Sequence, residues 1–110
     1  MFYGIARLEF FIPQSHSLKE KRAILNRIKG RIENRFHLAI AEVEYQDLWQ
    51  RAALGMALIA QGAQSARDGL QAARREAEQD PRIEVLDFQV RVGSFLDQPA
   101  AGGRSDGGEA

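Results

Sequence analysis

Hydrophobic and polar residues alternate over residues 2–12, which is typical of a strand with one buried face. Pro13 lacks the N–H that a strand ladder needs, so we expect the strand to end there. Similar alternation predicts further strands over residues 37–45, 52–60 and 84–92. The run 52–60 is rich in alanine, but Gly55 would weaken a helix interior, so we favour a strand.

Two other stretches repeat their hydrophobic residues every three or four positions, as helices do. The first follows Ser17, which with Glu20 three residues later fits a capping box. Its apolar stripe consists of Ile24, Leu25, Ile28, Ile32 and Phe36. The second has a thin stripe and stops at Asp80-Pro81; its members are Ala66, Leu70, Ala73 and Ala77.

The predicted element order is β-α-β-β-α-β. Right-handed crossovers turn this order into a ferredoxin-like α+β fold, a four-stranded antiparallel sheet of strand order 4-1-3-2 with both helices on one face. A chain of 110 residues is the size of one domain, which we place at residues 1–97. Residues 98–110 hold little that could be buried, so we expect a disordered tail.

The composition argues against catalysis. The chain has no cysteine, and its two histidines, His16 and His37, flank the first helix about 30 Å apart at about 1.5 Å per residue. We see no acid–base pair, metal-ligand cluster or glycine-rich phosphate loop, and we expect no enzyme, metal or cofactor. The N-terminus has no basic region and no apolar run approaches eighteen residues, so we expect a cytoplasmic protein without a membrane span.

Three cations stand in the first turn of the first helix, where the helix dipole is least favourable to them. Lys19, Lys21 and Arg22 each oppose this dipole by about 0.3–1 kcal/mol. Helical projection puts Lys21 on the apolar stripe and the other two beside it. An anionic partner would explain the cluster. Because the net charge of the chain is zero, the attraction for this partner must come from the local cluster and not from the charge of the whole molecule.

The predicted topology brings the loop before the third strand to the same sheet edge as this turn. Two interpretations follow. In the first, RNA or another anion contacts Ser17, Lys19, Lys21, Arg22, Trp49 and Arg51. In the second, the cations pair internally with Glu42 or Asp47, and Trp49 packs against the helix. Glu42 and Glu44 are expected on one face of their strand.

The sheet face without helices would be partly apolar. It would carry Tyr3, Ile5, Arg7, Glu9, Phe11, Ile59, Asp87, Gln89 and Arg91. A homodimer through this face or a platform for bases would explain that mixture, although the third strand lacks the aromatics of RNA recognition motifs.

The chain also resembles the YlxP-like bacterial family. The resemblance rests on Ile12-Pro13 with residues 16–22, on Phe36 with residues 41–43, and on residues 47–52. It implies a ferredoxin-like fold and a cytoplasmic protein whose genes often lie beside those for translation factors, including a ribosome-binding factor. It supplies no activity. Our leading hypothesis is a non-enzymatic accessory protein that binds RNA or a ribosomal subunit, and the alternative is a homodimeric interaction module.

Overall fold

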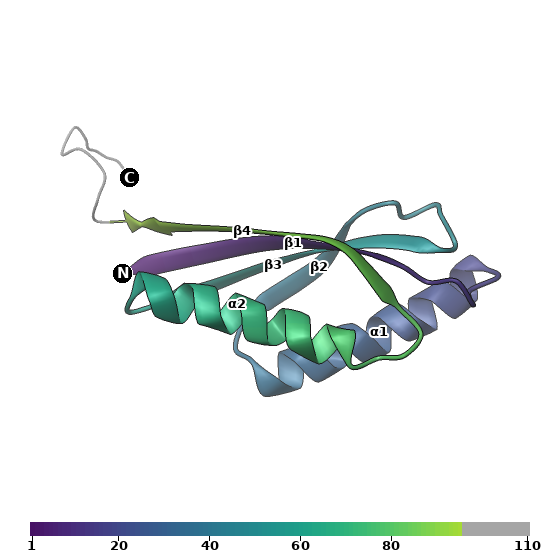
Figure 1. Ribbon diagram of the computed structural model, residues 1–110, viewed down its shortest axis with the longest axis horizontal. Coiled ribbons are helices and arrows are strands. Elements are labelled where there is room, and N and C mark those ends of the chain that lie inside the picture. The colour runs from purple at the N-terminus through teal and green to yellow at the C-terminus, as the bar shows by residue number, and fades with distance from the viewer. Residues whose placement is uncertain (96–110) are drawn as a thin grey trace.

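The computed structural model describes residues 1–95, so the predicted tail lies outside the described residues. The elements are β1 (Phe2–Phe11), α1 (Leu18–Arg35), β2 (Ala39–Glu44), β3 (Arg51–Ala60), α2 (Ala63–Glu78) and β4 (Glu84–Ser94). The strands form one antiparallel sheet in the order β2-β3-β1-β4, and both helices cover the same face (Figure 1). This confirms the predicted ferredoxin-like architecture.

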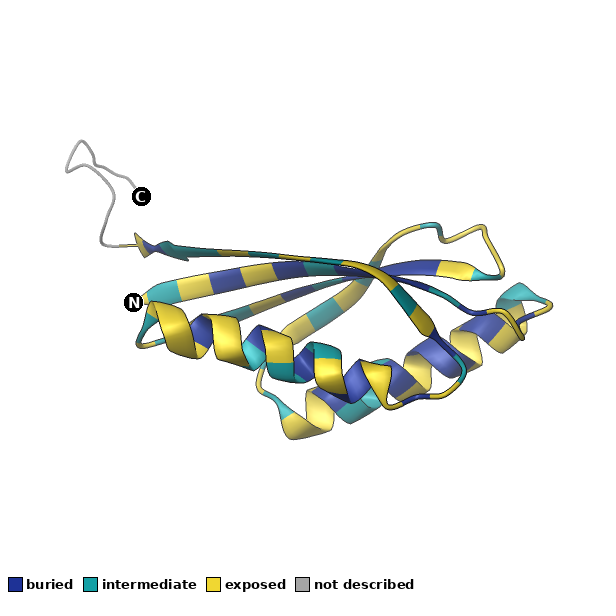
Figure 2. Cartoon of the chain, in the orientation of Figure 1, coloured by how far each residue is buried: buried dark blue, intermediate teal, exposed yellow. Residues whose placement is uncertain are grey.

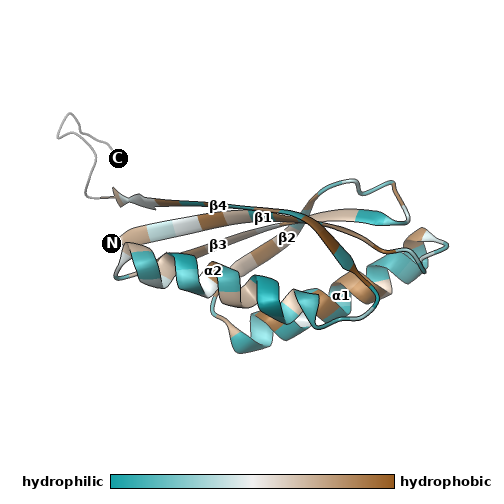
Figure 3. Cartoon of the chain, viewed as in Figure 1, coloured by the Kyte–Doolittle hydropathy of each residue, from teal (hydrophilic) through white to brown (hydrophobic). Residues whose placement is uncertain are grey.

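The core lies between the sheet and the helices. Buried positions recur along β1 and α1, including Leu8, Phe10, Ile28 and Ile32 (Figure 2). The thin stripe of α2 is buried as predicted, and the exposed side of α2 is hydrophilic (Figure 3). None of the helices within residues 1–95 is long and apolar enough to cross a membrane.

Each edge strand contains one irregularity that plain alternation does not predict. In β4, Asp87 lies opposite Glu9 and Val85 lies opposite Phe10, so Leu86 is an extra residue. In β2, Glu42 lies opposite Leu54 and Glu44 lies opposite Ala53, so Val43 is the extra residue. After such a bulge, each residue faces the side of the sheet opposite to the one that simple alternation predicts.

The bulge in β2 makes one prediction wrong. Glu42 and Glu44 were expected on the same face, but their partners Leu54 and Ala53 are neighbours on β3 and therefore face opposite sides. Glu42 points toward the helices and Glu44 toward the open face. The bulge in β4 similarly leaves Leu86 half exposed instead of on the buried face with Phe88.

Gly4 lets α2 lie close to β1. A Cβ atom at position 4 would lie 2.8 Å from Leu70 Cδ1 and 3.4 Å from Ala66 Cβ. Because Leu70 is completely buried, it has little room to move away.

We therefore expect Gly4→Ala to lower the free energy of unfolding by about 1–3 kcal/mol through overpacking. Gly30→Ala on α1 is the control, since a Cβ there meets nothing within 4 Å. That change should raise stability by roughly 0.5–1 kcal/mol, because alanine is the better helix former. Urea unfolding of both variants measures this, and equal effects would contradict the close contact at Gly4.

Candidate functional site

The candidate site lies at the end of the sheet where the loop before α1 meets the loop between β2 and β3. Gln50 joins the two loops. Its carbonyl accepts a hydrogen bond from Ile12 N at 2.7 Å, and its side-chain Nε2 donates to the carbonyls of Pro13 at 3.1 Å and Ser15 at 3.2 Å. The start of α1 is therefore held against the β2–β3 loop, as the predicted topology required.

The first turn of α1 is capped as the sequence predicts. Ser17 Oγ accepts a hydrogen bond from Glu20 N at 3.1 Å, and Glu20 Oε1 accepts one from His16 N at 2.7 Å. In a capping box the second bond usually goes to the cap residue itself, whereas here it goes to the residue before it. Ser17 thus serves to hold the turn, and Glu20 places one negative charge beside the cations.

Lys21 is bound within the protein. Only 1% of the residue is exposed, and its Nζ lies 2.9 Å from Glu42 Oε2. Nζ also donates a hydrogen bond of 2.5 Å to the carbonyl of Tyr45, a residue held at φ 64 in the left-handed region. Lys21 therefore follows the internal-pairing interpretation, with Glu42 as its partner on the helix side of β2.

Lys19 and Arg22 behave differently from Lys21. Both residues are exposed, and neither takes part in an ion pair within residues 1–95. Asp47, the other predicted partner, is also exposed and forms no ion pair in the described part of the chain. The predicted cationic cluster thus divides into one buried structural lysine and two cations that face solvent.

Arg51 is paired with a residue that the sequence did not suggest. Its guanidinium hydrogen-bonds Glu9 Oε2, with Nε at 2.6 Å, and lies 4.7 Å from the centre of the Tyr45 ring. Arg7 contacts Glu9 at 3.0 Å, Glu44 by a short ion pair, and Asp87 at 3.9 Å. Arg51 is thus part of a charge network on the open face, so its predicted availability for RNA is reduced.

This network shifts the ionisation of Glu9. The Arg51 hydrogen bond lowers the pKa of Glu9, and Arg7 acts in the same direction, while burial opposes both. The available sequence signal was the spacing of Arg7 and Glu9, which places both side chains on one face of β1. Their partner Arg51 could not be inferred without the register between β1 and β3.

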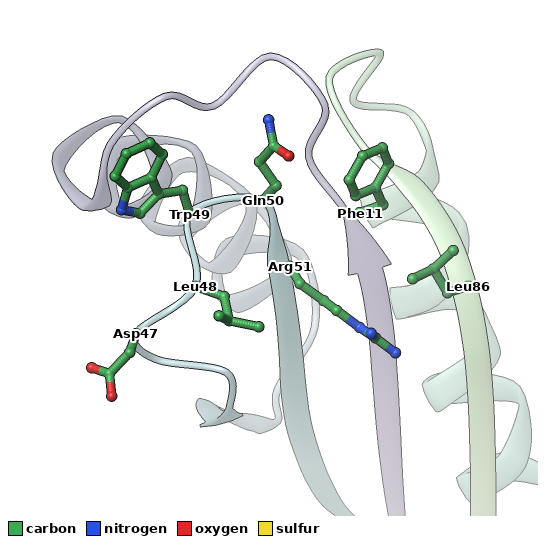
Figure 4. A pocket seen from close by; sticks show the side chains of 7 residues that line it. All are labelled: Phe11, Asp47, Leu48, Trp49, Gln50, Arg51 and Leu86. Atoms are coloured by element: carbon green, nitrogen blue, oxygen red, sulfur yellow. The ribbon is translucent and has the colours of Figure 1, made fainter.

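Trp49 is 53% exposed, so the interpretation in which it is buried against α1 is wrong. It belongs to an open pocket of about 630 Å³ lined by Phe11, Asp47, Leu48, Trp49, Gln50, Arg51 and Leu86 (Figure 4). In Figure 4 Leu48 and Arg51 lie on the side of the loop that faces Phe11 and Leu86, whereas the Trp49 ring lies on the other side. The pocket combines exposed apolar surface with one acidic and one basic side chain.

The site offers groups for binding. Within residues 1–95 no group of three or more His, Asp or Glu side chains is arranged to hold a metal ion. The arrangement supplies two solvent-facing cations, the start of a capped helix and an exposed indole.

Comparisons with known proteins agree with the resemblance seen in the sequence. A family model described as "Protein of unknown function (DUF503)" matches residues 3–90. The "Uncharacterized protein YlxP" of Bacillus subtilis (strain 168) is 40% identical over 81 residues, which cover 74% of this chain and 88% of that protein. The resemblance to the YlxP-like family is thereby confirmed.

Two solved structures share the fold. The designed protein Foldit4 has a TM-score of 0.51 at 9% identity and covers 84% of this chain and 97% of its own. A second designed protein, LFR1 1, described as having a ferredoxin fold, has a TM-score of 0.50 at 12% identity and covers 83% of this chain and 85% of its own. At such low identity these likenesses concern the fold alone.

The Lys21–Glu42 pair leads to a stability prediction. Glu42→Ala leaves the buried ammonium without its counter-charge and should lower the free energy of unfolding by about 3 kcal/mol. The double variant Lys21→Met/Glu42→Ala removes both charges and keeps an apolar stem on the stripe, so it should recover most of that loss. Urea unfolding of both variants tests this, and a double variant less stable than Glu42→Ala would contradict it.

The Glu9 network leads to a pH prediction. Because the pKa of Glu9 is lower in the folded protein, its stabilising contribution is present above the unfolded pKa of about 4.3 and is lost as the pH falls through the folded value. Glu9→Gln should therefore lower stability at pH 7 and make the loss of stability below about pH 4.5 shallower than in the wild type. The control is Glu33→Gln, an exposed position on α1. Denaturant unfolding across pH measures both, and an unchanged slope in Glu9→Gln would contradict the assignment.

Proposed function

We propose that this chain, which belongs to the DUF503 family of proteins of unknown function, is a non-enzymatic cytoplasmic accessory protein that binds structured RNA or a ribosomal particle. The observation that carries the proposal is the contrast between cations at one end of the molecule. Lys21 and Arg51 have carboxylate partners, whereas Lys19 and Arg22 are exposed without an ion-pair partner within residues 1–95.

The two exposed cations oppose the dipole of α1, so helix stability does not account for them. A phosphate group near this turn would bring the opposite charge to the positive end of the helix and to both side chains. The Arg22 guanidinium has the planar geometry that matches two phosphate oxygens, and the Lys19 ammonium acts as a point charge. Lys21 supports this contact indirectly, because its bond to Tyr45 holds the turn against the β2–β3 loop.

Trp49 adds a contact with a base to the proposed contacts with phosphate. The residue is 53% exposed, on the loop that Gln50 and Lys21 tie to the start of α1. Stacking of one base on an exposed aromatic ring contributes about 1–3 kcal/mol and tolerates any sequence. The combination of two cations and an exposed ring fits a structured RNA in which an unpaired base lies next to exposed backbone phosphates. It fits a regular duplex less well, because the bases of a duplex are stacked and paired.

The homodimer through the open face is the second candidate. Tyr3, Ile5 and Ile59 favour it, because all three are exposed on that face and Ile59 reaches 72%. The charges at the centre of the face already pair within one chain, so a dimer there would rest on the apolar end of the sheet.

Binding of ribosomal subunits in a salt series tests the RNA proposal. Lys19→Ala/Arg22→Ala should weaken binding about tenfold at low salt and reduce the slope of log affinity against log salt by roughly two, one for each phosphate contact. Arg67→Ala/Arg75→Ala, which removes two exposed cations from α2, should bind like the wild type. The readout with subunits is co-sedimentation. With a protein-free structured RNA in their place, quenching of the Trp49 fluorescence is a second readout, because the chain has one tryptophan.

If both double variants lost the same amount of affinity, the effect would come from the overall charge of the protein, and this would contradict the proposed site. Wild-type protein that ignores ribosomal subunits at low salt, and that forms a dimer which Ile59→Arg on the open face disrupts, would favour the second candidate.

A further inference from the structure

The two edges of the sheet differ in how well they are protected against pairing with another strand. β2 has six residues, a bulge at Val43 and two acidic side chains, Glu42 and Glu44. Short length, a bulge and like charges are the features by which natural edge strands avoid association. β2 is therefore a protected edge.

β4 has little of this protection. It has eleven residues, and beyond its bulge it pairs regularly with β1 from Asp87 to Ser94. This stretch contains neither proline nor lysine, and within residues 1–95 no strand lies along its outer side. One side of a regular strand thus presents free backbone N–H and C=O groups, which suits pairing with another strand.

The charges on β4 indicate which strand would fit. Asp87 and Arg91 lie two residues either side of Gln89, and all three point to the open face. Arg91 is exposed and forms no ion pair in the described part of the chain. Asp87 is half exposed and accepts a hydrogen bond of 3.0 Å from Gln89 Nε2, and its one ion contact within residues 1–95 is a long one of 3.9 Å to Arg7. Inward-facing Phe88 and Val90 stand symmetrically about the same residue.

We propose that a second copy of this chain pairs with β4 in antiparallel orientation about a twofold axis through Gln89. In this register Asp87 of each copy lies opposite Arg91 of the other, so two cross-strand ion pairs form at once. Phe88 of each copy lies opposite Val90 of the other. An axis perpendicular to the sheet keeps both helix layers on one side and joins the two sheets into one of eight strands.

Neighbouring registers do not have this complementarity. An axis through Phe88 places Asp87 opposite Gln89, and an axis through Val90 places it opposite Gly93. Neither forms an ion pair at these positions. The β4 pairing also differs from the open-face dimer, because it uses the strand edge and leaves Tyr3, Ile5 and Ile59 uncovered. It does not depend on RNA binding, since it uses the outer edge of β4 and none of the residues at the start of α1.

A single introduced thiol tests the register, because the chain has no cysteine of its own. The twofold axis brings the two Gln89 positions opposite each other, at a Cβ separation close to that of a disulfide. Under mild oxidation Gln89→Cys should form a covalent dimer at least about tenfold faster than Ile59→Cys on the open face. Faster linkage of Ile59→Cys, or equal slow linkage of both, would overturn the proposal.

Charge reversal tests the ion pairs separately. Asp87→Arg and Arg91→Asp should each raise the dimer dissociation constant about tenfold or more in sedimentation equilibrium, because like charges then lie opposite each other twice. The exchange Asp87→Arg/Arg91→Asp restores opposite charges and should return the constant to within about threefold of the wild type. A thermal melt confirms that each variant is folded. A monomeric wild type at roughly 100 µM, or a double variant as weak as the single ones, would overturn the proposal.

Discussion

The buried contact between Lys21 and Glu42 organises the end of the molecule where function is proposed. Lys21 lies on the apolar stripe of α1, so its stem is buried among hydrophobic residues while its Nζ must find a partner. Glu42 and the carbonyl of Tyr45 provide that partner at 2.9 and 2.5 Å. An ammonium this deep in the protein is tolerated only with such compensation.

Two local features of the backbone set the surroundings of this contact. Glu42 lies on the helix side of β2 by regular alternation with Ile40, and the bulge at Val43 after it turns Glu44 to the open face with Arg7. Tyr45 then takes a left-handed conformation that is uncommon for a residue with a side chain, and its carbonyl points at Lys21. Backbone strain of this kind persists where the surrounding contacts hold it, as they do here through Lys21 and the Leu48 N–H, which also bonds the Tyr45 carbonyl at 3.0 Å.

The same contact separates the cations by role. Lys21 ties the start of α1 to the β2–β3 loop, and Arg51 is held by Glu9 on the open face. Lys19 and Arg22 are left facing solvent on a helix start whose position is set by these buried and half-buried pairs. A rigid turn with exposed positive charge loses little conformational entropy when it binds an anion, which is why the internal pairs support the proposed function rather than compete with it.

Periodicity was enough to predict the element order and the place of Lys21 on the buried stripe. The sheet topology followed from the handedness of crossovers, and the capped start of α1 from the capping box. It failed at Val43 and Leu86, because alternation assumes that each residue faces one partner and a bulge adds a residue without changing the composition. The pairing of Arg51 with Glu9 was missed for a related reason. It depends on the register between β1 and β3, and register is a property of two strands rather than of either sequence.

The proposed contact surface for a phosphate-bearing partner consists of the exposed cations at the start of α1. The most direct measurement is a titration of isotope-labelled protein with a structured RNA, followed by amide and indole NMR signals. The largest shifts are expected at the backbone amides of residues 18–22 and at the indole N–H of Trp49, while the amides of α2 stay in place. Shifts confined to the open sheet face, or none at the start of α1, would contradict the proposed contact surface.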